Sequence, residues 1–184
     1  MADVDVWTVA LGRRDRRLAR TALRAVLAGY LNRSPDTIEI DHTPLGKPHL
    51  AADPLHFNLS HSRDIALIAV SATAPVGIDL EHPRAFRSPD RLARRFCTAR
   101  ELASIENPEQ LLRLWVRKEA VVKGIGDGLV RRLTEVDVLD DDLEDGWQCL
   151  DLPSPAPGFQ AAVAINAPPK ISLTTLRLHL APSQ

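Results

Sequence analysis

The chain has 184 residues, of which 45% are hydrophobic and 26% are charged, and its formal net charge is -1. A chain of this length buries about 70% of its unfolded surface, so it needs no disulfide or structural metal to hold a core. Lys+Arg 23 against Asp+Glu 24 excludes a strongly basic chain, which disfavours a protein built mainly to hold nucleic acid.

Cysteine usage and apolar runs indicate the compartment. Cys97 and Cys149 lack the CxxC spacing of a zinc site and are too few for a disulfide framework. The start MADVDVWTVA lacks the basic and apolar segments of a signal peptide, and the run IALIAVSATAPVGI is too short to span a bilayer. We therefore expect a soluble, cytoplasmic protein with no membrane partner.

The first part of the chain predicts strands around one helix. DVDVWTVAL alternates as a strand does, and apolar residues at helical spacing predict a helix from Arg16 to Leu31, stopped by Asn32 and Ser34-Pro35. TIEID predicts a short strand, and TPLGKPHL predicts a loop. HFNLS, DIALIAVSA and VGIDLEH then predict three more strands.

The middle of the chain changes to a helical period. Ser88-Pro89-Asp90 is typical of a helix start, Thr98 of the cap of a second short helix, and Asn107-Pro108 of a longer third helix that ends near Gly126. EVDVL, WQCLDL, GFQAAVAI and ISLTTLRLHL predict strands after it. Helices segregated between runs of strands favour an α+β fold over a doubly wound sheet.

The strand VGIDLEH carries two carboxylates. Residues two apart on a strand point to the same face, so Asp79 and Glu81 are expected to project together. Paired carboxylates repel unless a cation or proton lies between them, and oxygen ligands favour a hard cation such as Mg²⁺. An ordinary exposed acidic face is the alternative, and the short DxE spacing alone does not exclude it.

The longer helix contains WVRKEAVVKG, residues 115–124. Glu119 and Lys123 stand four apart, and a surface salt bridge worth about 0.2–0.5 kcal/mol is the simplest interpretation. That interpretation leaves Lys118, near the apolar side with Trp115, unexplained unless its stem is buried and its ammonium reaches water.

A third group of residues suits an anion. Lys47 in GKP, with Ser60 and His61 in NLSHS, supplies a cation and donors for phosphate, although a lone histidine after a strand is more often structural. No GxxxxGK[ST] pattern is present, which disfavours a P-loop ATPase or kinase. A second anion site, or simply a solvated helix face, is indicated by Arg13, Arg14, Arg16, Arg17, Arg20 and Arg24.

In this order, GKP, FNLSHS, VGIDLE and WVRKEAVVKGIGDGL resemble the phosphopantetheinyl transferase superfamily, and most nearly its surfactin-synthetase-activating type. The resemblance implies two similar α+β halves, residues 1–83 and 84–184, related by a pseudo-twofold axis with the active site in the cleft between them. It implies a monomeric enzyme that uses Mg²⁺ to transfer phosphopantetheine from coenzyme A to a serine of an acyl- or peptidyl-carrier protein, releasing adenosine bisphosphate.

The resemblance also implies a role for each matching residue. Asp79, Glu81 and Glu119 would bind Mg²⁺, and Lys123 would contact the coenzyme A phosphates and stabilise the leaving group. Glu101 in RRFCTAREL matches the acidic residue assigned as general base in this type, with a metal-bound water as the alternative. The remaining coenzyme A contacts would be Arg20, Lys47, Ser60 and His61.

The arginine-rich stretch 85–103, with Phe96 at least half exposed, is a candidate docking surface for an acidic carrier helix. Two other functions remain open. The first is a non-catalytic carrier-binding module on the same scaffold, which the full set of expected metal ligands and Lys123 disfavours. The second is a small nucleic-acid-binding protein, which the neutral charge and scarce aromatic residues disfavour. The sequence does not distinguish fatty acid, polyketide and peptide pathways.

Overall fold

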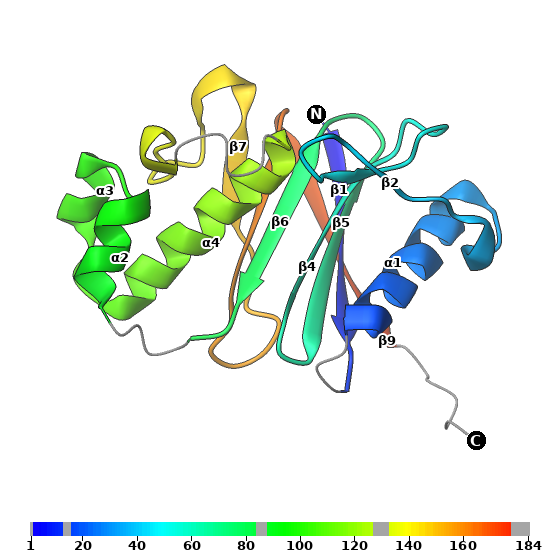
Figure 1. Cartoon of the computed structure of the whole chain (residues 1–184), viewed down its shortest axis with the longest axis horizontal. Helices are drawn as coiled ribbons and strands as arrows, with labels where there is room; N and C mark the ends of the chain where they lie inside the picture. Colours follow the sequence, from blue (N-terminus) through cyan, green and yellow to red (C-terminus); the bar gives the residue numbers. More distant parts are fainter. Residues whose placement is uncertain (1, 13–15, 84–87, 127–132, 178–184) are drawn as a thin grey trace.

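The computed structural model describes residues 2–12, 16–83, 88–126 and 133–177. These residues form a mixed α+β fold with a four-stranded sheet, a three-stranded sheet and a short two-stranded sheet. Figure 1 shows α1 and α4 on opposite sides of the two larger sheets. The strands are β1 (Ala2–Ala10), β2 (Asp41–His42), β3 (Pro48–His49), β4 (His56–Ser62), β5 (Ile65–Ser71), β6 (Val76–Glu81), β7 (Gln148–Asp151), β8 (Gln160–Ile165) and β9 (Pro169–Arg177). The helices are α1 (Arg16–Leu31), α2 (Pro89–Phe96), α3 (Ala99–Ser104) and α4 (Pro108–Ile125), with 3₁₀ turns η1 (Pro35–Thr37), η3 (Leu133–Glu135) and η4 (Glu144–Gly146).

The four-stranded sheet has the order β4-β5-β1-β9. β1 pairs antiparallel with β5 and parallel with β9. One face is covered by α1, whose Leu23 and Leu27 pack with Phe57 and Ile68 in one apolar cluster. Burial of this apolar stripe accounts for the helix that the spacing predicts over Arg16–Leu31.

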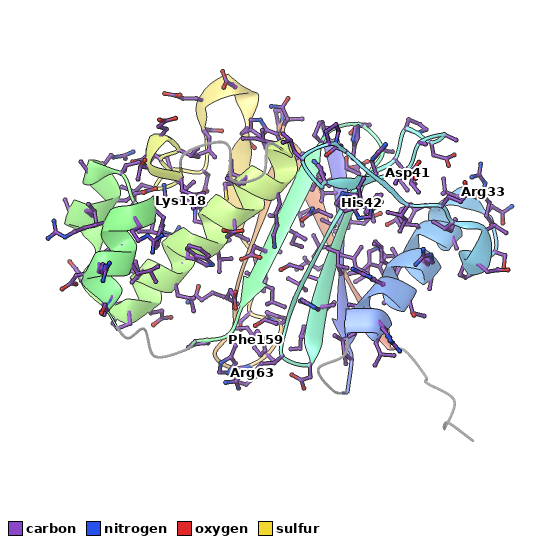
Figure 2. All side chains as sticks on the ribbon, viewed as in Figure 1. Arg33, Asp41, His42, Arg63, Lys118 and Phe159 are labelled. Atoms are coloured by element: carbon purple, nitrogen blue, oxygen red, sulfur yellow. The ribbon has the colours of Figure 1, made fainter. Side chains whose placement is uncertain are left out.

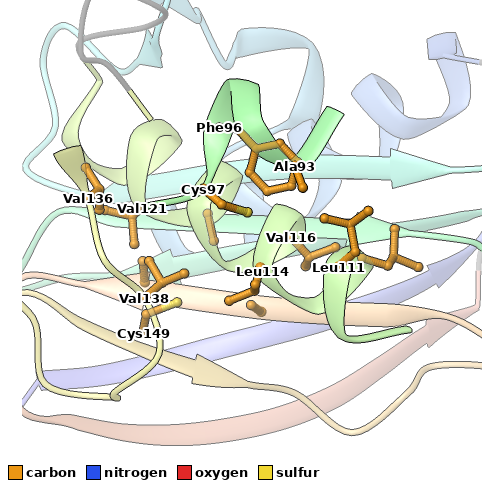
Figure 3. Close-up of a cluster of buried hydrophobic side chains, with 14 of the residues drawn as sticks. Ala93, Phe96, Cys97, Leu111, Leu114, Val116, Val121, Val136, Val138 and Cys149 are labelled. Atoms are coloured by element: carbon orange, nitrogen blue, oxygen red, sulfur yellow. The ribbon is translucent and has the colours of Figure 1, made fainter. Parts of the chain in front are cut away.

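The three-stranded sheet has the order β6-β8-β7 and is antiparallel throughout. Its inner face packs against the four-stranded sheet, where Ile78 and Val163 meet Val6 and Leu67. Its outer face is covered by α4, and the apolar cluster between this face and α4 is shown in Figure 3. The two sheets therefore lie between two helices, and each helix covers a different sheet.

Phe96 belongs to the core beneath α2 and α4 (Figure 3). It is 1% exposed and meets Trp115 edge to face, with ring centroids 5.1 Å apart. The expectation that Phe96 contributes to an exposed docking surface is therefore wrong. The expected surface also includes residues 85–87, which lie outside the described residues.

The predicted helix starts in the middle of the chain are confirmed. Thr98 and Glu101 form a capping box at α3, and Asn107 Oδ1 accepts from the backbone N–H of Gln110 at 2.9 Å at α4. Gly126 ends α4 with a φ of 85°, in the left-handed region that glycine adopts without strain.

Two predicted strands are wrong. TIEID is mostly replaced by η1 and an irregular stretch, because Pro35 starts a 3₁₀ turn and only Asp41 enters β2. EVDVL is irregular after η3, because side chains from α3 and α4 bond its backbone in place of a neighbouring strand. The expected division at residue 83 stays a prediction. Both larger sheets contain strands from either side of it, because β6 pairs with β8 and β1 pairs with β9. Among the described helices, none combines the length and apolarity that a membrane crossing requires.

Candidate functional site

A row of side chains joins β4 to β6. Asn58, Ser60 and Ser62 occupy every second position of β4 and so share one face of it. The backbone N–H of Ile78 in β6 donates to Asn58 Oδ1 at 3.0 Å. Ser60 Oγ donates to Asp79 Oδ1 at 2.8 Å, and Ser62 Oγ donates to Glu81 Oε2 at 3.2 Å. Because two serines on one face of β4 reach both carboxylates, Asp79 and Glu81 project together as the strand alternation predicts.

Glycines let α4 approach β6 closely enough to complete the site. A Cβ atom at Gly77 would lie 2.1 Å from the carbonyl oxygen of Ala120 and 2.3 Å from the backbone nitrogen of Gly124. The backbones of strand and helix are therefore in direct contact, which only glycine permits. This contact places Glu119 and Lys123 of α4 beside Asp79.

Lys123 forms its ion pair with the strand. Its Nζ lies 2.5 Å from Asp79 Oδ1 and donates to Ser60 Oγ at 3.2 Å. Asp79 is almost completely buried, whereas the side chain of Lys123 is 30% exposed. Among the described residues, the ammonium group of Lys123 thus pairs with Asp79 and not with Glu119, as a simple helix salt bridge would require.

The carboxylates at this point repel one another. Burial raises the pKa of Glu119, and the charges of Asp79 and Glu81 raise it further, while Lys123 lowers it. Asp79 Oδ2 is buried and has no hydrogen-bond partner in the described chain. An unpartnered carboxylate oxygen beside a second carboxylate whose charged form is disfavoured suits a hard cation.

No group of three or more His, Cys, Asp or Glu side chains in the described part of the chain is already arranged around a metal position. The ammonium group of Lys123 is instead the cation in contact with Asp79. The donor types fit Mg²⁺, and Asp79, Glu119 and Glu81 are the residues that would hold it.

A cavity of about 270 Å³ opens beside these residues. Glu119 and Lys123 line it on one side and Leu59 and Lys47 on the other. Lys47 Nζ donates to the backbone carbonyl of Gly124, and burial lowers the pKa of its ammonium group. The cavity thus brings together two lysines from distant parts of the sequence, which suits a phosphate-bearing ligand.

The other residues expected to contact coenzyme A are separated by the sheet. Ser60 pairs with Leu67 on the inner face, whereas His61 pairs with Ala66 on the face that α1 covers. Arg20 is exposed on α1. Neither Arg20 nor His61 is among the described residues that line the cavity. Of the expected coenzyme A contacts, only Lys47, Lys123 and Ser60 therefore lie near the carboxylates. Arg13 and Arg14 lie outside the described residues.

Glu101 lies in the protein interior. It is fully buried and forms an ion pair with Lys118, also fully buried, at 2.7 Å. Its Oε1 accepts the N–H of Val138 at 2.9 Å, and its Oε2 accepts the N–H of Thr98 at 2.7 Å. A carboxylate enclosed in this way has no access to the hydroxyl of a carrier protein, so the structure does not support Glu101 as general base.

Lys118 is the residue that sequence reasoning left without a role. Its ammonium group donates to the backbone carbonyls of Leu133, at 2.8 Å, and Val136, and it neutralises Glu101. It belongs to α4 and is labelled in Figure 2. Its neighbour Arg117 is also buried and bonds the backbone carbonyls of Val138 and Asp140. Together they attach the irregular segment after η3 to α4, immediately before Glu119.

Comparison with known proteins finds similarity to one family. Residues 75–158, which include Asp79, Glu81, Glu119 and Lys123, match the family described as the 4'-phosphopantetheinyl transferase superfamily. Over this stretch the chain is therefore similar to the phosphopantetheinyl transferase superfamily.

Several members of the superfamily are similar over most of this chain. The 4'-phosphopantetheinyl transferase HetI of Nostoc sp. is 39% identical over 136 residues, which are 68% of this chain and 57% of the relative. The 4'-phosphopantetheinyl transferase AcpT of Salmonella typhimurium is 36% identical over 66% of this chain and 65% of the relative. The L-aminoadipate-semialdehyde dehydrogenase-phosphopantetheinyl transferase of Mus musculus is 32% identical over 60% of this chain and 41% of the relative. The matched region thus spans less than two thirds of each of these phosphopantetheinyl transferases.

Proposed function

We propose that the protein transfers the phosphopantetheine arm of coenzyme A to a serine of an acyl- or peptidyl-carrier protein, with Mg²⁺ as cofactor. The observation that carries this proposal is the convergence of Asp79, Glu119 and Lys123 beside a cavity that also contains Lys47. Similarity to this family supports the same reaction, because the relatives are named for this transfer.

The reaction exchanges one phosphorus–oxygen bond for another. The serine oxygen attacks the phosphorus that carries the pantetheine arm, and the bond from that phosphorus to the bridging oxygen breaks. Adenosine 3',5'-bisphosphate leaves with the electron pair of that bond, and the serine loses its proton. Such a transfer needs charge neutralisation and in-line positioning more than covalent help from the protein.

Each residue at the site has a part in this proposal. Asp79, Glu81 and Glu119 would hold Mg²⁺, which when bound supplies positive charge and orientation to the pyrophosphate. Lys123 and Lys47 would bind phosphate oxygens in the cavity.

The burial of Glu101 against Lys118 argues against that carboxylate as the proton acceptor. Water or a carboxylate at the site itself would accept the proton of the serine hydroxyl instead. Arg20 and His61, on the α1 side of the sheet, would contact the nucleotide only if coenzyme A reaches past the edge of β4.

The finer parts of the proposal are the surfactin-synthetase-activating type and a monomer of two α+β halves related by a pseudo-twofold axis. Each larger sheet has one long helix on its outer face, α1 on the four-stranded sheet and α4 on the three-stranded sheet, and each takes one strand from the other proposed half, β9 and β6 respectively. The cavity between β4 and α4 lies where such halves would meet. These observations support the arrangement, and the motif order supports the type.

The test is a transfer assay with the full chain. The protein is incubated with coenzyme A, Mg²⁺ and a panel of apo acyl- and peptidyl-carrier proteins, and intact-mass spectrometry detects the phosphopantetheine addition. We expect addition to at least one carrier, and none with Asp79→Asn or after chelation of Mg²⁺. A chain that binds coenzyme A and carriers but modifies none would be a carrier-binding module.

A further inference from the structure

The candidate site has an excess of negative charge. Asp79, Glu81 and Glu119 are close enough for the first and second to raise the pKa of the third. Among the described residues, the cation in direct contact with this group is Lys123, through Asp79. Carboxylates so close together need a compensating cation.

The contact of Lys123 is with one oxygen of Asp79 only. Lys123 Nζ and Ser60 Oγ both bond Oδ1, at 2.5 Å and 2.8 Å, and leave Oδ2 without a partner. Ser60 would continue to hold Oδ1 if the ammonium group moved away. Oδ2 is the oxygen that remains available to a second cation.

The side chain of Lys123 lines a cavity into which its ammonium group can move. Its side chain is 30% exposed and lines the cavity of about 270 Å³ with Lys47. A lysine has a flexible stem and a point charge, so rotation of its side chain moves the ammonium group by several ångströms without movement of the helix.

We propose that Lys123 is an internal counter-ion of the carboxylate site: it competes with a divalent cation for Asp79, and cation binding releases it into the cavity toward phosphate. Metal binding and phosphate binding are then coupled through one lysine. A cation added beside Asp79 makes a phosphate-binding lysine available, and a phosphate that attracts Lys123 makes Asp79 a stronger ligand. By linkage, each ligand strengthens the other by the same factor. This inference rests on the proposed function, because it assigns the same site a metal and a phosphate.

The test measures Mn²⁺ binding to the full chain by electron paramagnetic resonance, first without nucleotide. Removal of a positive charge in contact with a ligand oxygen strengthens cation binding, so Lys123→Met should tighten Mn²⁺ binding about tenfold. Lys123→Arg keeps the charge and should bind Mn²⁺ within about twofold of the unmodified chain. Lys47→Met is the matched control, because it removes a lysine of the same cavity whose ammonium group bonds Gly124 and not Asp79. It should change Mn²⁺ binding by less than about threefold.

The second measurement is the coupling itself. Mn²⁺ should tighten the binding of adenosine 3',5'-bisphosphate in the unmodified chain, and this gain should shrink at least about fivefold in Lys123→Met. Circular dichroism checks the fold, and Lys123→Gln replaces Lys123→Met if the latter unfolds.

The outcomes separate the two proposals. Unchanged or weaker Mn²⁺ binding in a folded Lys123→Met variant overturns the counter-ion role. If the unmodified chain still transfers phosphopantetheine, the proposed function survives that result. Absence of both Mn²⁺ binding and transfer in the unmodified chain overturns both.

Discussion

Replacement of Lys118 by methionine tests whether the buried pair beneath the site is structural. The change keeps most of the volume of the side chain but leaves Glu101 as an uncompensated charge at 0% exposure. Removal of one partner from a buried ion pair costs about 3–5 kcal/mol. The carbonyl oxygens of Leu133 and Val136 also lose their donor, which adds to this cost. Since domains of this kind are stable by about 5–15 kcal/mol, the variant should lose a large part of its stability.

The assay is urea denaturation followed by circular dichroism. Arg33→Ala is the control, because Arg33 pairs with Asp53 at 3.0 Å but is 49% exposed. An exposed pair contributes at most about 1 kcal/mol, so the control should lose little stability. The double variant Glu101→Gln with Lys118→Met removes the uncompensated charge and should recover stability relative to Lys118→Met alone.

Two results would refute this reasoning. The first is a Lys118→Met variant that loses no more stability than Arg33→Ala. The second is a double variant that is less stable than Lys118→Met alone, since this would mean that Glu101 is not destabilised by the loss of its partner. Activity gives a separate test. A folded double variant should retain transfer, whereas loss of transfer in that variant would indicate that Glu101 is the catalytic base.

Three further predictions concern other parts of the molecule. Because burial and neighbouring carboxylates raise the pKa of Glu119, its stabilising contribution is complete at low pH and is lost as pH rises through the raised pKa. Glu119→Gln should therefore be more stable than the unmodified chain at pH 8 and equal to it near pH 4, in urea denaturation without divalent cations; a less stable variant at pH 8 would contradict this. Gly77→Ala should cost about 1–3 kcal/mol or more and weaken Mn²⁺ binding, because its Cβ meets the α4 backbone, whereas Gly29→Ala, with nothing within 4 Å, should not destabilise the fold. Burial raises the pKa of the Cys97 thiol to about 11 and that of the Cys149 thiol to about 12, so Ellman's reagent at pH 8 should react with them only on unfolding, and rapid reaction with the native chain would disprove their burial.

The sequence predicts most elements because their signals are local. The apolar stripe of α1 and the caps Thr98 and Asn107 act within one or two turns, so spacing is sufficient to find them. EVDVL fails for the opposite reason: its alternation is that of a strand, but its hydrogen bonds go to Glu101 and Lys118, which are distant in sequence. No local pattern records such partners.

The candidate site divides in the same way. Asp79 and Glu81 follow from strand alternation, and motif resemblance adds Glu119 and Lys123. The contact of Lys123 with Asp79 depends on the approach of α4 to β6, which Gly77 permits. The small residues at Gly77 and Gly124 were a signal for this approach, because an isolated glycine in a strand or helix often marks close backbone contact.

The pairing of β1 with β9 has a consequence for how the protein forms in the cell. Among the described strands, β1 is synthesised before the others and its parallel partner β9 after them, so Val4 can pair with Ile171 only once the intervening chain has been made. The four-stranded sheet therefore stays open at one edge while α4 and its sheet are being synthesised. Such non-local pairing slows folding and leaves β1 exposed to other chains in the meantime. Until β9 is available, the edge of β1 is thus the part of the four-stranded sheet that is open to pairing with another chain.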